Sequence, residues 1–523
     1  MADGDQPVRK VCIVGGGTAG WMTAAVLSQW LSQVDVTLVE SEEIGTVGVG
    51  EATIPHIRNY LALAGIDQLK MISETKATFK LGIQFVGWGA EGESYIHGFG
   101  KIGHDMLWLH PHQLWMAAKE RAPGSVKHFD NYSIAGAAAL RNRFSFPDKR
   151  NPNSPLADVE YAYHFDASLF ARFLRGESEA RGVTRVEGRI VEVIQDPESG
   201  FVTAVKLTDG RMIEADLFVD CSGMRALLIG DALGVGYEHW NKWLLCDRAI
   251  AVPCESVSPM TPYVRCTTRS AGWQWRIPLQ HRLGNGYVYS SNLISDDDAA
   301  QTLMSTLDGA PQADPRPVRF APGLRSKAWE KNVVSIGLSS GFLEPLESTS
   351  IHLIQTGIQK LLALFPATGF SQADINEYNR QARFEFEDVR DFIIAHYNVT
   401  RRSGEPFWDH VRTMDVPDSL KERYELFASS GRWFKRGAAE LFAEESWVQV
   451  LIGQGFDFKP DPVAQFVKTE EILDFLNDIA EVVGDTAEGM PDHGEFVLKL
   501  PKSSDQPAPP SPDVMHNLAE AHR

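Results

Sequence analysis

Three glycines near the start of the chain have the spacing of a nucleotide-binding turn. Gly15, Gly17 and Gly20 form a GxGxxG pattern that follows a β-branched run and opens a stretch with helical spacing. The first glycine permits a tight turn, the second lets the backbone approach a pyrophosphate, and the third lets helix and strand pack closely. Glu40 lies twenty residues further on and can accept a hydrogen bond from a ribose hydroxyl. The pattern predicts a dinucleotide site, and a plain turn is the alternative.

Two tryptophans two residues apart form the second notable pattern. In residues 272–278 (GWQWRIP), strand alternation places Trp273 and Trp275 on one face, and Pro278 ends the strand. The two indoles would then form a rigid apolar wall. Taken alone, the segment is equally consistent with two tryptophans in an ordinary sheet core.

Two later segments favour FAD over NAD as the nucleotide. Residues 215–223 (ADLFVDCSG) combine an acidic entry, a strand and a Ser-Gly exit, which is typical of the second cofactor contact in FAD-containing hydroxylase-like proteins. Residues 333–341 (VVSIGLSSG) bring another strand to a turn of small residues, where backbone could reach a flavin edge. The sequence contains no second GxGxxG for NAD(P)H, so we expect electrons to arrive from elsewhere.

The composition narrows the class of protein. Lys and Arg number 50 and Asp and Glu number 69, a net charge of −19, which disfavours nucleic acids and anionic membranes as partners. The five cysteines are widely spaced without a CxxC pair and indicate reduced thiols. His110 and His112 lack partner ligands at a suitable spacing, so we expect no metal site. The polar start and the lack of a long apolar run predict a cytoplasmic protein.

The pattern along the chain predicts an α/β protein with a mixed-sheet FAD-binding lobe and a mostly helical second lobe. Residues 8–14, 21–31 and 34–39 give a strand, a helix and a strand, and residues 162–223 a helix and short strands. Residues from 371 onward have mostly helical periodicity. We expect the FAD lobe at 8–365, with substrate-facing insertions at about 101–160, the helical lobe at 366–500, and a disordered Pro-rich tail at 501–523.

Five segments together closely resemble the flavin-dependent tryptophan halogenases. They are residues 15–20 (GGGTAG), 48–55 (GVGEATIP), 79–83 (FKLGI), 272–278 (GWQWRIP) and 342–351 (FLEPLESTSI). Further matches lie at 163–166 and 391–397, and the resemblance runs from about residue 8 to about residue 455. It implies that reduced FAD and oxygen oxidise chloride or bromide to hypohalous acid, which halogenates an aromatic substrate. The resemblance also implies a separate flavin reductase as a partner, and a homodimer is common among such relatives.

The resemblance assigns roles to individual residues. Lys80 matches the lysine that holds the oxidant or is halogenated by it, a role that suits a lysine whose pKa is lowered by burial. Glu347 matches the carboxylate that stabilises the cationic ring and removes its proton. His97 and Phe99 match the aromatic pair that sandwiches an indole. The resemblance places FAD against Gly15, Gly17, Thr18, Ala19, Gly20, Glu40, Gly50, Ala52, Ile190, Leu338, Ser348 and Ile351.

The halide site is expected where a helix starts at residue 349. Backbone N–H groups of Thr349 and Ser350 have no partner within the helix and can bind an anion. Tryptophan-specific members often carry glycine at the position of Ser350, which leaves the halide preference open. The resemblance gives Trp273 and Trp275 the role of a partition between flavin and substrate, past which a small oxidant diffuses.

The substrate and two competing functions stay open from the sequence. Residues 437–447 are shorter and poorer in aromatics than the region that grips tryptophan in specific enzymes. We therefore expect indole, a substituted indole or a larger indole-bearing molecule rather than free tryptophan. An FAD-dependent aromatic monooxygenase and a non-catalytic flavin-binding redox protein are the alternatives.

Overall fold

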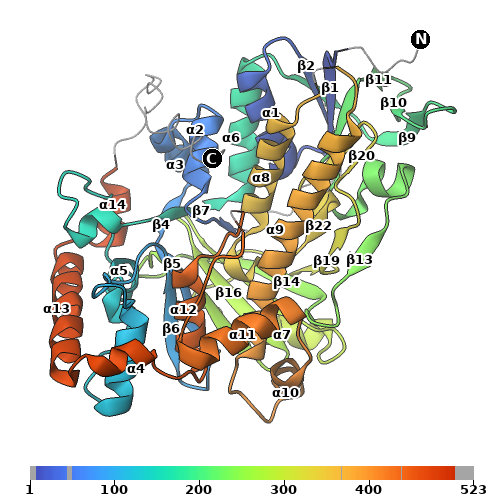
Figure 1. Cartoon of the computed structure of the whole chain (residues 1–523). Helices are drawn as coiled ribbons and strands as arrows, with labels where there is room; N and C mark the ends of the chain where they lie inside the picture. Colours follow the sequence, from blue (N-terminus) through green and yellow to red (C-terminus); the bar gives the residue numbers. More distant parts are fainter. Residues whose placement is uncertain (1–6, 44–49, 367, 438, 501–523) are drawn as a thin grey trace.

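The computed structural model describes residues 7–43, 50–366, 368–437 and 439–500 (Figure 1). In a six-stranded sheet, β1 (Lys10–Val14) pairs in parallel with β2 (Asp35–Glu40) and with β12 (Leu217–Asp220). The sheet continues to β21 (Val333–Ser335) and β20 (Trp329–Glu330) on one side and to β8 (Thr184–Glu187) on the other. Helix α1 (Thr18–Trp30) follows β1, so the predicted strand, turn, helix and strand are confirmed.

A seven-stranded sheet holds the tryptophan segment near its centre. Its order is β18 (Arg316–Arg319), β14 (Arg248–Cys254), β17 (Leu283–Tyr289), β16 (Gly272–Pro278), β15 (Tyr263–Arg269), β5 (Gly82–Val86) and β6 (Ser94–Gly98). Every residue of β16 is buried, and Pro278 is its last residue, as predicted. Because the strand is central and fully buried, its side chains are held rigidly, as the predicted partition would require.

Three smaller sheets complete the mixed architecture. They are β3 (Gly50–Ala52), β7 (Ala162–Asp166) and β4 (Thr78–Lys80); β11 (Met212–Glu214), β10 (Val202–Leu207) and β9 (Ile190–Gln195); and β13 (Tyr237–His239), β19 (Gly323–Arg325) and β22 (Gly341–Phe342). The stretch 183–195 contains both β8 and β9, which pair in different sheets. The predicted α/β class with mixed sheets is confirmed.

The remaining helices form two groups. One group lies between or directly after the strands along the chain, and the other makes up the carboxyl-terminal third. The first group is α2 (Ile57–Leu63), α3 (Gln68–Thr75), α4 (Pro111–Arg121), α5 (Ile134–Leu140), α6 (Ala167–Ala180), α7 (Asp296–Ser305) and α8 (Ser350–Ala363). The second is α9 (Gln372–Asn398), α10 (Pro406–Thr413), α11 (Asp418–Ser430), α12 (Glu444–Gly453), α13 (Thr469–Glu488) and α14 (His493–Leu498). The predicted helical pattern after residue 371 is confirmed.

The long helix α9 and the shorter α12 bring the carboxyl-terminal third against the sheets. Helix α9 lies beside α8, and α12 packs on β6 (Figure 1). Helix α13 packs on α4 and α5 of the 101–160 segment, and one contiguous apolar core includes residues from both sides of position 365. The boundary predicted there stays a prediction. The predicted tail at 501–523 and residues 48 and 49 lie outside the described residues.

Within those described ranges, no helix combines the length and apolarity that crossing a membrane requires. All five cysteines are free and buried, as the sequence indicates.

Candidate active site

The glycine turn meets the second predicted FAD segment directly. Gly15 has a φ of +114°, and a Cβ atom there would lie 2.2 Å from the carbonyl oxygen of Cys221. At Gly20 a Cβ atom would lie 1.8 Å from the carbonyl oxygen of Gly15, so close helix-strand packing requires glycine. At Gly17 a Cβ atom would meet nothing within 4 Å. The turn is therefore closed on two sides and open on the side where a pyrophosphate would approach, which fits FAD.

Three further residues of the predicted nucleotide site lie at the same edge of the six-stranded sheet. Glu40 ends β2 and accepts hydrogen bonds from Arg185 and, at 3.4 Å, from the Trp21 indole. Ala19 lies against the third predicted segment, since a Cβ atom at Gly337 would be 2.8 Å from it. Leu338 belongs to the 3-10 turn that starts there and is 38% exposed.

The remaining predicted FAD contacts are more widely spread. Thr18 begins α1, and Gly50 and Ala52 lie in β3, where Gly50 approaches Ile277 of β16. Ser348 and Ile351 flank the start of α8. Ile190 begins β9 and packs on the apolar cluster beneath β1 and β2. The assignment of these residues to FAD stays a prediction.

Gly17→Val tests the nucleotide turn without disturbing the fold. Because the added side chain would enter open space, we expect an unchanged melting temperature and at least about a tenfold weaker Kd for FAD, a loss of about 1.4 kcal/mol. Fluorescence titration with FAD measures the Kd, and Gly176→Val on α6, where a Cβ atom also meets nothing within 4 Å, is the control. Equal FAD affinity in both variants would contradict this site.

Lys80 is fully buried at the end of β4. Its Nζ donates to the Thr53 carbonyl oxygen at 3.0 Å and to Ser348 Oγ at 2.9 Å, and lies 5.3 Å from the centre of the Phe99 ring. Burial lowers the pKa of Lys80 to about 7, although Glu347 opposes the shift. The predicted buried lysine with a lowered pKa is present. Near neutral pH a substantial fraction is the neutral amine.

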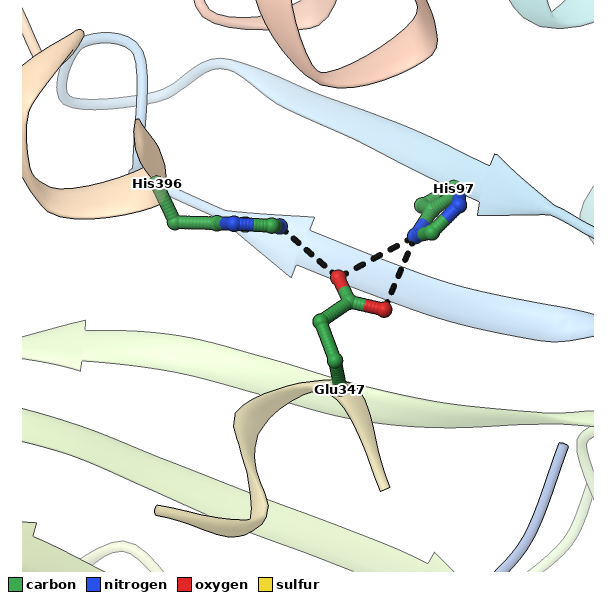
Figure 2. A group of neighbouring side chains, drawn as sticks. All are labelled: His97, Glu347 and His396. Atoms are coloured by element: carbon green, nitrogen blue, oxygen red, sulfur yellow. Dashed lines mark hydrogen bonds and ion pairs between the residues drawn. The ribbon is translucent and has the colours of Figure 1, made fainter. Parts of the chain in front are cut away.

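Glu347 is held between two histidines (Figure 2). Its carboxylate lies 3.0 Å from His97 Nδ1 and 2.7 Å from His396 Nε2, and all three side chains are at most 3% exposed. Although burial opposes the change, His97 and His396 lower the pKa of Glu347 to about 2. Glu347 is therefore ionised throughout the neutral range, beside Lys80.

These three residues are also the kind that bind metals, since their ligand atoms lie within 4.8 Å of one another. Ligands around a tetrahedral ion with bonds of about 2.1 Å would stand about 3.4 Å apart. The N–O separations of 2.7 and 3.0 Å are shorter and match direct contacts between the side chains. His110 and His112, which are not expected to bind a metal, stack with ring centres 5.9 Å apart.

The start of α8 has the features expected of an anion site. Thr349 precedes Ser350, the first residue of the helix, and its buried Oγ1 has no hydrogen-bond partner. Among the described residues, neither backbone N–H of this pair has a hydrogen-bond acceptor. An unpaired hydroxyl and two unpaired amides at a helix start favour an anion such as a halide.

The two tryptophans of β16 are buried neighbours. Trp273 and Trp275 have ring centres 6.2 Å apart, and Gly286 on β17 leaves room for the Trp275 ring. Trp273 Nε1 donates to Glu344 Oε2 at 3.1 Å. Burial raises the pKa of Glu344 to about 7, although the hydrogen bonds from Tyr397 and Trp273 oppose the shift. A buried carboxyl thus fixes one indole of the wall.

Each of the two predicted substrate residues lies beside one of the two reactive groups. His97, on β6, contacts Glu347, and Phe99 follows it beside Lys80. Phe392 of α9 approaches His97 at 5.7 Å between ring centres and stacks on Phe442 at 3.9 Å. Phe442 belongs to the segment that the sequence marked as altered, so that segment does reach the site.

Three contributors to the site were assigned no role from the sequence. His396 and Tyr397 are adjacent on α9 and hold Glu347 and Glu344, and Gln449 of α12 bonds the backbone of Gly98. The first two lie inside the matching stretch 391–397, but neither their spacing nor their composition indicates a partner. Only the packing of α9 against residues 344–347 brings these pairs together.

Comparison with known proteins agrees with this geometry. The family model for tryptophan halogenases matches residues 10–469. The tryptophan 6-halogenase ThaL of Streptomyces albogriseolus is 34% identical over 447 residues, which cover 81% of this chain and 82% of the relative.

Two solved structures are closer in sequence. A flavin-dependent halogenase from Xanthomonas campestris superposes with a TM-score of 0.90 at 49% identity, covering 94% of this chain and 98% of that one. BrvH, a flavin-dependent halogenase from Brevundimonas sp. BAL3, gives a TM-score of 0.90 at 44% identity, covering 94% of this chain and 100% of that one. The resemblance seen in the sequence is confirmed, and the chain belongs to the tryptophan halogenase family.

Proposed function

We propose that this protein halogenates indole-type substrates by using reduced FAD from a separate flavin reductase, oxygen, and chloride or bromide. The observation that supports this most strongly is the pairing of a buried lysine and a buried carboxylate, Lys80 and Glu347, beside an unpaired helix start. When bound in its reduced form, FAD with oxygen supplies the oxidising equivalent that converts halide to hypohalous acid.

The start of α8 would hold the halide. The N–H groups of Thr349 and Ser350 and the Thr349 hydroxyl can donate to an anion, and the Thr349 side chain is fully buried. Ser348 lies between this start and Glu347 and accepts a hydrogen bond from Lys80. One short segment thus connects the halide site with the amine that would receive the oxidant.

Lys80 and Glu347 would share the substitution step. The neutral Lys80 amine can hydrogen-bond hypohalous acid, or exchange one N–H hydrogen for the halogen with release of water, and so present the halogen to a ring held near His97 and Phe99. The ring becomes cationic when halogen adds. The Glu347 carboxylate stabilises that charge and then accepts the proton from the substituted carbon. A pKa of about 2 suffices, because the proton of such a cation is strongly acidic.

The substrate is proposed to be larger or more varied than free tryptophan. A cavity of about 380 Å³ lies between the end of β6 and the start of α12, lined by residues that include Lys101, Asp105, His110, Glu444 and Glu445. Its volume is that of a small-molecule site. The lining contains the carboxyl groups of Asp105, Asp158, Glu444 and Glu445 beside Lys101 and three histidines, and it includes none of Lys80, His97, Phe99 and Glu347. The cavity would therefore hold a polar group attached to the indole, and not the ring at the reactive groups.

The test is a direct product analysis. The protein is incubated with FAD, a flavin reductase, NADH and chloride or bromide over a panel of indole, substituted indoles, tryptophan and indole-bearing peptides. Mass spectrometry should show halogen in place of hydrogen in at least one indole. Addition of oxygen would favour an aromatic monooxygenase, and bound flavin without any product would favour a redox carrier.

The pH dependence of this reaction follows from Lys80. Because burial holds its pKa at about 7, the protonated form dominates at pH 6 and the neutral amine dominates at pH 8. We expect kcat to rise about fivefold to tenfold between these values and then to level off. The measurement is kcat under saturating halide, with the reductase in excess at every pH. A flat profile between pH 6 and 8 would contradict the role of Lys80.

A further inference from the structure

Strand β6, which carries His97, is the edge strand of the seven-stranded sheet, and among the described residues it pairs with β5 only. Just beyond the strand, the N–H of Phe99 donates to the Leu81 carbonyl oxygen at 2.8 Å on the same side. Because hydrogen bonds alternate between the two sides of a strand, the N–H and C=O groups of Ile96 and Gly98 point to the open side. Buried backbone groups on such an edge need other partners.

Side chains from two other parts of the chain bond this open side. Gln449 of α12 accepts a hydrogen bond from the Gly98 N–H at 2.9 Å and donates one to the Gly98 carbonyl oxygen at 3.0 Å. Asp130, in the 3-10 turn Phe129–Tyr132, accepts a hydrogen bond from the Ile96 N–H at 3.1 Å. Gln449 and Asp130 are 4% and 7% exposed, so water competes little for these bonds. The Gln449 amide therefore holds Gly98 as a neighbouring strand would.

The residue held in this way lies at the centre of the predicted substrate site. Gly98 stands directly between His97 and Phe99 in the chain. The His97 ring contacts Glu347 at 3.0 Å, and the centre of the Phe99 ring lies 5.3 Å from Lys80 Nζ. A displacement of Gly98 would move both rings relative to the two reactive groups. Misplacement of a reacting group by about 1 Å can lower a rate about 10²-fold.

The same amide also connects β6 with the cavity near the start of α12. Gln449 Nε2 donates a second hydrogen bond, at 3.0 Å, to the Glu445 carbonyl oxygen one turn earlier on the helix. Glu444, Glu445 and Val448 of that helix line the cavity that we propose for a polar group of the substrate. One side chain thus fixes how far this cavity lies from the residues that would hold the ring.

We infer that Gln449 is a positioning residue: it pairs with both backbone groups of Gly98 and so sets where His97 and Phe99 hold the substrate ring. The inference rests on the proposed halogenase function. Asp130 acts in the same way on the other outward-facing residue of the strand. Because both side chains act through the backbone of β6, their loss should change where the ring binds and should leave halide oxidation intact.

Gln449→Met keeps the length of the side chain and removes all three hydrogen bonds. We expect KM for the indole to rise about fivefold to tenfold, as for the loss of a net hydrogen bond, with a smaller change in kcat. A ring that is held less uniformly should also raise the proportion of the minor halogenated isomer by about twofold or more. Steady-state kinetics and chromatography with mass spectrometry measure these quantities. The Kd for FAD should not change.

Gln454→Met is the matched control. It makes the same change at a buried glutamine at the end of α12, whose amide bonds the Tyr95 hydroxyl and not the backbone of β6. It should keep the wild-type KM and isomer proportion. If Gln449→Met lowers kcat but keeps both of these at the wild-type values, the residue is merely structural and the inference is wrong.

Asp130 offers a second pair of variants, which is useful if Gln449→Met folds poorly. Asp130→Asn keeps an acceptor for the Ile96 N–H and should keep the wild-type KM, whereas Asp130→Ala removes the acceptor and should raise KM. Equal KM in Asp130→Ala and the wild type would contradict the positioning of the ring through this edge of β6.

Hydrogen exchange tests the contact without turnover. Because the Gly98 N–H is paired and buried, a peptide covering residues 94–99 should exchange slowly in the wild type. Gln449→Met should speed its exchange about fivefold or more, and Gln454→Met should not. Unchanged exchange in Gln449→Met would overturn the inference even if the enzyme halogenates indoles. If exchange is faster but no indole is halogenated, the proposed function fails and the role of Gln449 in holding β6 stands.

Discussion

Lys80→Ala is expected to abolish halogenation while FAD binding is kept. Without the amine, hypohalous acid has no group to hold it near the substrate ring, and loss of such a group typically costs about 10²- to 10⁴-fold in rate. Product formation per flavin oxidised, measured by mass spectrometry beside oxygen consumption, should fall by at least about 10²-fold. Flavin oxidation itself should continue, because the proposed halide site at Thr349 is untouched.

Lys80→Met serves as the control for packing, since it keeps most of the stem of the side chain. The folded pKa of about 7 lies below the unfolded value of about 10.4. The unfolded chain therefore binds more protons between these values, and the stability of the wild type should rise with pH there. Lys80→Met should lack this rise and should also lack halogenation. Activity in either variant would contradict the assigned role.

Glu347→Gln is the second change with a large expected effect. The amide keeps the size of the side chain, but it can neither balance a cationic ring nor accept its proton. We expect kcat to fall by about 10²- to 10⁴-fold, with KM for the indole changed much less. Steady-state product formation over a range of indole concentrations separates the two constants.

Glu385→Gln provides the comparison for Glu347→Gln, because Glu385 is also a glutamate held in an ion pair, with Lys360, but lies between α8 and α9 away from the reactive groups. It should keep kcat. A Glu347→Gln enzyme with wild-type kcat would mean that another group removes the proton.

Local patterns in the sequence predicted the parts of the fold that depend on neighbouring residues. The GxGxxG turn needs glycine for steric reasons that hold wherever it occurs, and the two-residue period of a strand places Trp273 and Trp275 of β16 on one face. These two features require no knowledge of distant segments. The burial of Lys80 was expected from the resemblance to the halogenases, and the lysine is fully buried.

Contacts between distant segments could not be predicted in the same way. His396 meets Glu347, and Tyr397 meets Glu344, across about fifty residues of sequence. A buried histidine on a helix looks the same whether its partner is a carboxylate or a carbonyl oxygen. The low pKa of Glu347 follows from these contacts. The sequence therefore indicated a general base, but it did not indicate how low the pKa of that base is.

The segment from Glu344 to Ser350 has a consequence for how such an enzyme could diversify. Within seven residues it contains the partner of Trp273, the carboxylate of Glu347, the acceptor for Lys80 and the unpaired amides of the helix start. Their mutual distances are therefore fixed by one stretch of backbone. The side chains that would meet the substrate come from β6, α9 and the segment before α12. New substrates could be accommodated by exchange in that segment, without resetting the distances on which oxidant delivery depends.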